Sequence, residues 1–249
     1  MVSFSLEGKT ALVTGGTRGL GKGIAEGLLE AGAKVVIVGS SDSVMDVADK
    51  MGEGAYGLKC DLSSEKDIER GFNEALSILG GRLDILVNNA GIQRRNKCEN
   101  FLLTDWDDVI NVNLRAVFTL CQHAGRHMLN NGYGKIINVA SMLSFFGGYT
   151  VPAYSASKGG VMQLTKALSN EWAGRGINVN AIAPGYMATD MNTALINDEG
   201  RNKEILSRIP AGRWGKAEDL KGLSVFLASS ASDYVSGAII PVDGGYMGR

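Results

Sequence analysis

A tyrosine and a lysine stand four residues apart in the stretch PAYSASKGGV, at Tyr154 and Lys158. On a helix these two positions share one face, so the phenol would lie beside the ammonium. A free tyrosine titrates at about pH 10, too high for a base at neutral pH, and a nearby positive charge favours its phenolate. Such a tyrosine could take a proton from an alcohol or give one to a carbonyl. Alone, the same spacing also fits an ordinary helix start.

Two more polar residues stand where they could join this chemistry. Ser141 ends a predicted strand over 134–141, and ligands bind at that end of the strands in α/β sheets. Its hydroxyl could hold a substrate oxygen, or it could simply cap the strand. Asn113 is a polar residue in an apolar part of a predicted helix over 105–129. It could bind a water that relays protons to Lys158, or it could be a buried asparagine bonded to backbone groups.

Short apolar runs alternate with longer segments of helical periodicity along the chain. Strands are predicted over 10–14, 34–38, 55–60, 134–141, 177–184 and 237–245, and 83–91 is predicted as a strand followed by a turn. Helices are predicted over 20–33, 64–81, 105–129, 154–174 and 217–229. The strands are apolar almost throughout, which is typical of a sheet covered on both faces, and the alternation favours right-handed crossovers. We therefore expect one α/β domain, residues 1–249, around a doubly wound, mostly parallel sheet.

The stretch from about 186 to 214 breaks this alternation. Long insertions in compact domains are often lids or binding loops. We therefore expect this insertion to serve the substrate.

A glycine-rich turn, TGGTRGLG over 14–21, links the first predicted strand to the first predicted helix. Gly15, Gly19 and Gly21 would let the backbone approach a pyrophosphate, and the helix N-terminus adds free N–H groups. The alternative is a structural turn without a ligand. The stretch GEGAYG over 52–57 has similar glycine spacing, but it precedes a strand and opens no helix, so we interpret it as a turn.

The tip of the second predicted strand should select the cofactor. An acidic residue there would bind the ribose 2′-hydroxyl of NAD, and a basic residue nearby would bind the 2′-phosphate of NADP. The tip reads VGSSDS over 38–43, where a neutral Gly39 is followed by Ser40. Arg18, in the glycine loop, could pair with a phosphate or face solvent. The residues therefore leave NAD(H) and NADP(H) both open.

Composition argues against several other classes of protein. The formal net charge is −1 over 249 residues and no basic run occurs, so nothing indicates a nucleic-acid or acidic-membrane partner. No stretch approaches the roughly 20 apolar residues of a membrane span, and the N-terminus lacks a signal-peptide layout, so we expect a cytoplasmic protein. The three cysteines have no metal-ligand spacing. His123 and His127 share a helix face without a third ligand, so we expect no metal.

Together these features resemble the short-chain dehydrogenase/reductase family over the whole chain. The resemblance rests on TGGTRGLG, NNAG (88–91), Asn113, Ser141, YSASK and the PG pair (184–185), in the family's order. It implies a Rossmann-type domain, in a homotetramer or dimer, that moves hydride between NAD(H) or NADP(H) and a carbon bearing oxygen. It also implies that Tyr154 is the acid/base and that Lys158 lowers its pKa and holds the nicotinamide ribose. Ser141 would orient the substrate, and Asn113 would complete a proton relay.

The same resemblance implies a set of cofactor contacts. Asp61 resembles the adenine contact, Asn89 the residue beside the adenosine ribose, and the segment 184–189 the one that holds the carboxamide. The full set is Gly15, Thr17, Arg18, Gly19, Leu20, Gly21, Ser40, Asp61, Leu62, Asn89, Ala90, Gly91, Tyr154, Lys158, Pro184, Gly185 and Thr189.

Longer stretches, such as SMLSFFGGYTVPAYSASK over 141–158, resemble family members that act on hexonate-type sugar acids. This implies 2-dehydro-3-deoxy-D-gluconate or 2-deoxy-D-gluconate as substrate. Gluconate or a 3-oxoacyl thioester is the alternative within the family, and a non-catalytic dinucleotide-binding sensor is the alternative outside it. A sugar carboxylate favours an arginine, which can bind it with two hydrogen bonds. The candidate substrate residues are Ser141, Arg94, Arg95, Tyr149 and Arg201; for the arginines, a subunit interface or solvent is the alternative.

Overall fold

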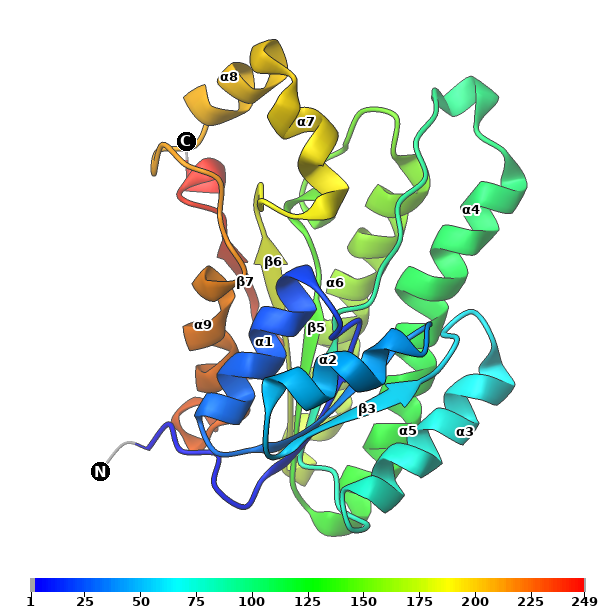
Figure 1. The fold of residues 1–249 in the computed structure, drawn as a ribbon, viewed down its shortest axis with the longest axis vertical. Coiled ribbons are helices and arrows are strands. Elements are labelled where there is room, and N and C mark those ends of the chain that lie inside the picture. Colours follow the sequence, from blue (N-terminus) through cyan, green and yellow to red (C-terminus); the bar gives the residue numbers. More distant parts are fainter. Residues whose placement is uncertain (1–2, 249) are drawn as a thin grey trace.

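The chain is built around a parallel sheet, seen in a computed structural model that describes residues 3–248 (Figure 1). Seven strands in this range pair in the order β3-β2-β1-β4-β5-β6-β7, and all neighbours are parallel. Their bounds are β1 Thr10–Thr14, β2 Lys34–Gly39, β3 Ala55–Lys59, β4 Ile85–Asn88, β5 Gly134–Val139, β6 Ile177–Pro184 and β7 Ile239–Val242. The order reverses between β1 and β4, and such a reversal leaves a crevice at the carboxyl ends of the strands. The predicted doubly wound sheet is confirmed.

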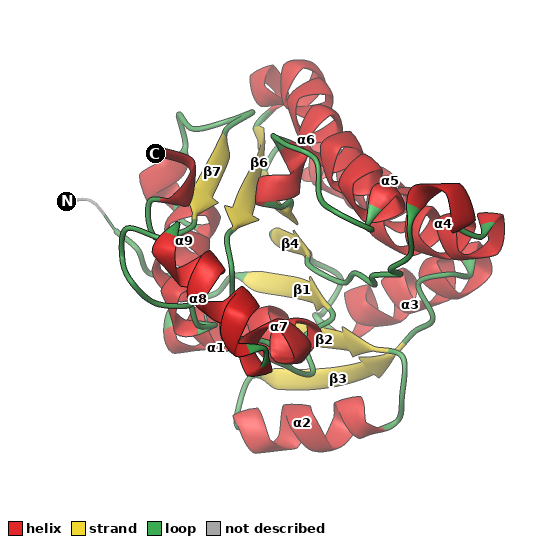
Figure 2. Cartoon of the chain, turned by 90° about the horizontal axis from the view of Figure 1, so that it is seen from above, coloured by secondary structure: helices red, strands yellow, loops and turns green. Residues whose placement is uncertain are grey.

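Helices cover both faces of this sheet (Figure 2). Their bounds are α1 Gly19–Glu30, α2 Ser43–Met51, α3 Glu65–Ile78, α4 Leu103–Ile110, α5 Ala116–Asn131, α6 Pro152–Trp172, α7 Thr193–Asn197, α8 Glu199–Ser207 and α9 Glu218–Ala228. Helices α1, α2 and α9 pack on one face, and α3, α5 and α6 on the other. Neighbouring strand residues point to opposite faces, so Leu12 and Leu86 join one buried cluster while Val13 and Val87 join the other.

Two helical segments differ from the prediction. Helix α2 was not predicted; it crosses from β2 to β3 and buries Val44 and Ala48. The long helix predicted over 105–129 is interrupted by a five-residue π-helical segment, Asn111–Arg115, which separates α4 from α5. Segments of this kind are frequent at functional sites, and this one contains Asn113.

The insertion over 186–214 contains α7 and α8, which lie above the carboxyl ends of the strands (Figure 1). A small buried cluster attaches it to the rest of the domain, and its members are Met142, Ile205, Ile209 and Tyr246. The indole N–H of Trp214 also donates to the Asn202 side chain at 2.8 Å. In the described part of the chain, no helix combines the length and apolar character needed to cross a membrane.

Candidate active site

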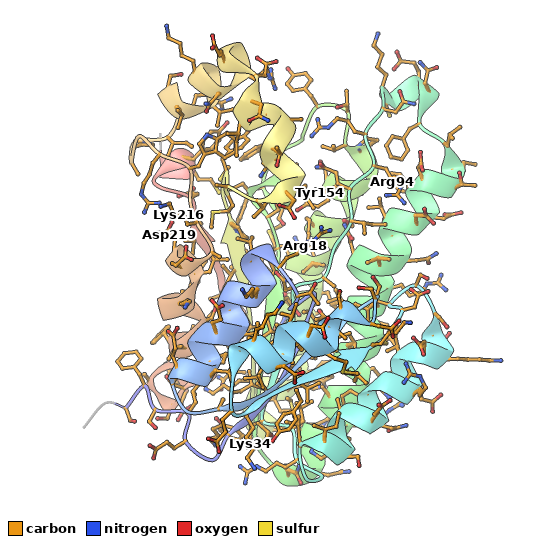
Figure 3. The ribbon with its side chains drawn as sticks, viewed as in Figure 1. Arg18, Lys34, Arg94, Tyr154, Lys216 and Asp219 are labelled. Carbon is orange, nitrogen blue, oxygen red and sulfur yellow. The ribbon has the colours of Figure 1, made fainter. Side chains whose placement is uncertain are left out.

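A cavity of about 910 Å³ opens where the strands end, and it is the place where the predicted residues meet. Every residue of the predicted cofactor set lines it, as do Ser141 and Arg94. Figure 3 shows Arg18, Arg94 and Tyr154 around this end of the sheet, whereas Lys34 lies at the opposite end. The volume is of the size that holds a cofactor or drug-sized ligand.

The glycine loop fits a pyrophosphate. Gly15 and Gly19 have φ angles of 65° and 53°, which an L side chain rarely adopts. A Cβ atom on Gly15 would stand 2.9 Å from the Asn89 amide nitrogen, so the loop lies against the NNAG turn. Among the described residues no side chain caps the N-terminus of α1, and its first N–H groups therefore remain available to an anion.

The NNAG turn holds the glycine loop through hydrogen bonds. The Asn89 amide donates to the carbonyl oxygens of Thr14 and Gly15, at 3.0 and 3.1 Å. The Thr14 hydroxyl accepts the N–H groups of Asn89 and Ala90 in return. Asn89 lines the cavity, but its amide nitrogen already holds the loop in place.

A side chain at the tip of β2 would press on its neighbours. A Cβ atom on Gly39 would lie 2.7 Å from Thr17 Cγ2 and 3.2 Å from Val44 Cβ. Ser40 follows on the cavity wall, and Arg18 faces the same cavity from the glycine loop. The Arg18 guanidinium forms a largely exposed ion pair with Asp190 at 3.3 Å, which joins the glycine loop to the segment after β6.

Ser141 and Tyr154 lie close together because the carboxyl end of β5 is next to the start of α6 in space. Tyr154 lies in the first turn of α6, which starts with Pro152, a residue suited to that position because it has no N–H group to satisfy. Burial raises the pKa of the Tyr154 phenol, and a hydrogen bond with Ser141 lowers it in part. The Ser141 oxygen accepts the N–H of Leu143 at 3.1 Å, so its own proton can be donated to the phenol or a substrate oxygen. Ser141 thus caps the helical turn Met142–Ser144 and also lines the cavity.

Lys158 is buried one turn further along α6. Its ammonium donates to the Val139 carbonyl at 2.6 Å and lies 5.7 Å from the centre of the Tyr154 ring. Burial lowers the pKa of Lys158 to about 8. Burial and Ser141, rather than Lys158, dominate the pKa of the phenol in this structure, which differs from the expected effect of the lysine.

Asn113 is fully buried in the π-helical segment. Its Oδ1 accepts the N–H of Ile92 at 2.8 Å, and its Nδ2 donates to the Ile92 carbonyl at 2.9 Å and to Ser157 Oγ at 3.3 Å. The side chain therefore ties the loop after β4 to α6. This geometry matches the alternative in which backbone groups satisfy a buried asparagine.

The candidate substrate residues divide into two groups. Arg94 lines the cavity and pairs with Asp105 and Asp108, at 3.4 and 3.3 Å. Arg95 points elsewhere and donates to the Tyr149 carbonyl and the Thr150 hydroxyl. Tyr149 is 88% exposed and Arg201 pairs with Glu204, and neither lines the cavity.

Several lining residues were not predicted. They are Gln93, Asp108, Val112, Val139, Met187, Asp190, Met191 and Asn192, among others. Gln93 directly precedes Arg94, and the last four fall in the insertion that breaks the strand–helix rhythm. That insertion was therefore the signal that could have identified them.

The histidine pair has packing partners. His127 Nε2 accepts the N–H of Leu83 at 3.1 Å, and the His123 ring stacks on Phe72 with centroids 5.3 Å apart. Within residues 3–248, no three metal-binding side chains gather as a metal site would need.

Comparisons with known proteins give consistent results. The family described as "Enoyl-(Acyl carrier protein) reductase" matches residues 15–247. The chain is 51% identical to a 2-dehydro-3-deoxy-D-gluconate 5-dehydrogenase of Bacillus subtilis (strain 168), over 99% of this chain and 98% of the relative. It is 52% identical to the enzyme of the same name from Escherichia coli (strain K12), with the same coverage. A crystal structure described as a putative 2-deoxy-D-gluconate 3-dehydrogenase of Agrobacterium tumefaciens with bound NADP matches with a TM-score of 0.92, 51% identity and full coverage of both chains.

Proposed function

Because the chain belongs to the short-chain dehydrogenase/reductase family of oxidoreductases, we propose that it moves a hydride between a nicotinamide cofactor and a sugar acid. The substrate is of the 2-dehydro-3-deoxy-D-gluconate or 2-deoxy-D-gluconate type, and the reacting carbon carries a hydroxyl or keto oxygen. One observation carries the proposal: Ser141, Tyr154 and Lys158 line the same cavity as the glycine loop. The names of the relatives support the choice of substrate.

Proton transfer is the part of the reaction that the side chains perform. When bound, the nicotinamide supplies or accepts the hydride. Tyr154 takes the proton of the alcohol or returns it to the carbonyl, and Ser141 donates a hydrogen bond to the same substrate oxygen. Lys158, buried one turn further along α6, holds the nicotinamide ribose. Asn113 keeps the loop at Ile92 in place against α6.

We infer a preference for NADP(H) over NAD(H). Position 39 is a glycine, so the usual acidic partner of the ribose 2′-hydroxyl is missing, and the Cβ atom of any replacement would lie 2.7 Å from Thr17 Cγ2. Arg18 and Ser40 stand on the cavity wall near this point and offer a positive charge and a hydroxyl to a 2′-phosphate. Dissociation constants for the two oxidised cofactors, measured by fluorescence, test this inference; tighter binding of NAD⁺ contradicts it.

The lining of the cavity includes the polar residues Gln93, Arg94 and Asn192, whose amide and guanidinium donors suit a polyhydroxylated acid. Among the three candidate arginines Arg94 alone lines the cavity. We propose that it receives the carboxylate in exchange for its ion pairs with Asp105 and Asp108. The insertion over 186–214 contributes Met187, Met191 and Asn192 to the lining, and we propose that it serves as the substrate loop.

The assembly is a homotetramer. Leu102, Leu103 and Phe118 are apolar side chains on the α4–α5 side of the domain that remain 47–79% exposed. At one edge of the sheet, strand β7 is only partly buried, and Phe4 is half exposed. Two separate apolar surfaces are what a tetramer with two kinds of interface needs.

The direct test of the function is absorbance of the reduced nicotinamide during incubation with NADP⁺ or NAD⁺ and a panel of sugar acids and neutral polyols. Turnover of a deoxy- or ketodeoxy-hexonate supports the proposal. Turnover of neutral alcohols alone contradicts the sugar-acid substrate and leaves the proton-transfer role of Tyr154 intact.

A further inference from the structure

Ser144 contacts both segments that carry the proposed catalytic side chains, although it does not line the cavity. Its oxygen accepts the backbone N–H of Ser141 at 3.3 Å, and its hydroxyl donates to the backbone carbonyl of Lys158 at 2.7 Å. Its own N–H donates to the Ser141 carbonyl at 2.9 Å. One small side chain therefore bridges the end of β5 and the second turn of α6.

The covalent connection between these two segments is a weak constraint. It runs through the exposed residues Phe145 and Phe146, two glycines and the exposed Tyr149. It then passes Thr150, whose φ of 61° is unusual for a residue with a branched side chain. The relative position of Ser141 and Tyr154 must therefore be set by contacts that cross from strand to helix.

Two such contacts involve the reacting region directly. One is the bond from the Lys158 ammonium to the Val139 carbonyl, and it uses a group that the reaction itself needs. The other is the bridge made by Ser144, whose groups have no chemical part in the reaction. Ser144 can therefore hold the two segments together throughout the catalytic cycle.

We propose that Ser144 is a positioning residue that fixes the place of the Ser141 hydroxyl relative to the Tyr154 phenol. The proposal rests on the proposed function of these two side chains. Both hydrogen-bond strength and the rate of an oriented reaction fall steeply with small displacements. Without the bridge, the Ser141 N–H loses its acceptor and the end of β5 can shift against α6.

The test compares Ser144→Ala with Ser144→Thr, which keeps a hydroxyl. Ser144→Ala should lower kcat about tenfold with a much smaller change in KM, since the loss concerns the transition state rather than substrate binding. Ser144→Thr should recover most of the activity. Ser169→Ala is the matched control, because Ser169 lies on α6, the helix that Ser144 contacts, and bonds to Ser236 at 2.8 Å, away from the cavity. It should leave kcat unchanged.

A second readout needs no substrate and decides the outcome. The pKa of Tyr154 is obtained from the tyrosinate absorbance of the protein minus that of the matching Tyr154→Phe variant, with and without Ser144→Ala. The Ser141 side chain lowers the pKa of Tyr154, so its displacement in Ser144→Ala should raise that pKa further. An unchanged Tyr154 pKa overturns the proposal, even if kcat falls. Failure of the wild-type protein to turn over any substrate would count against the proposed function alone, because the titration still reports on Ser144.

Discussion

An aspartate at position 39 should fail to create an NAD-specific protein. Gly39→Asp places a Cβ atom 2.7 Å from Thr17 Cγ2 and 3.2 Å from Val44 Cβ, well inside normal contact distance. Overpacking of this kind costs about 2 kcal/mol, which corresponds to roughly 6 °C in Tm for a domain of this size. We also expect the Thr17 side chain to keep the new aspartate carboxylate away from the adenosine ribose of the cofactor. We expect a lower Tm, weaker NADP⁺ binding and no gain in NAD⁺ affinity.

The double variant Gly39→Asp/Thr17→Ser provides the control. It removes only the methyl group that the new Cβ would contact, and the remaining neighbours at Val44 need to move by a few tenths of an ångström. The double variant should recover most of the lost Tm and bind NAD⁺ more tightly than either single variant. Thermal unfolding and cofactor fluorescence measure both effects. Tight NAD⁺ binding and an unchanged Tm in Gly39→Asp alone would refute the packing argument.

Three further outcomes follow from the site and its surroundings. Arg94→Ala should raise KM about tenfold or more for acidic substrates and little for neutral ones. Arg201→Ala, which lies outside the cavity, should leave KM unchanged for both classes of substrate. Equal effects of Arg94→Ala on the KM of both classes would contradict the role of Arg94. The pKa of Lys158 is lowered from 10.5 to about 8 in the folded protein, so the unfolded chain keeps this proton to a higher pH. The free energy of unfolding of the wild type, minus that of Lys158→Met, should therefore rise between about pH 8 and 10.5. Denaturant titrations in which this difference falls would contradict the prediction. Arg213 and the Lys216 N–H lower the Asp219 pKa to about 2 from 3.8. Asp219→Asn should therefore destabilise by about 1 kcal/mol at neutral pH, an effect lost as pH falls through about 2, and a deficit that persists at the acid end would show another cause.

The spacing of residues predicted those features that depend on local geometry. Tyr154 and Lys158 lie on one face of α6 because four residues make about one helical turn. Ser141 lies at the carboxyl end of β5 because its apolar strand precedes it. Parallel strands such as β2 and β3 need a crossover connection, which is usually a helix. The topology alone could therefore have predicted α2, although its short apolar pattern did not.

Features that depend on contacts between distant segments could not be predicted in this way. The sequence shows a glycine at position 39. It does not show that Thr17, 22 residues earlier in the chain, would contact any larger side chain there. Arg94 and Arg95 are neighbours in sequence, yet one lines the cavity and the other bonds to the segment before α6. Sequence spacing does not give the direction of a side chain on a loop.

The central claim is that Tyr154 transfers the proton, and Tyr154→Phe tests it most directly. The measurement is turnover of a deoxy- or ketodeoxy-hexonate, followed by reduced-nicotinamide absorbance, together with the cofactor dissociation constant of the same variant. We predict that kcat falls by roughly 10²- to 10⁴-fold, the usual contribution of general acid–base catalysis, while cofactor binding is retained. Turnover at the wild-type rate with cofactor bound would contradict the account.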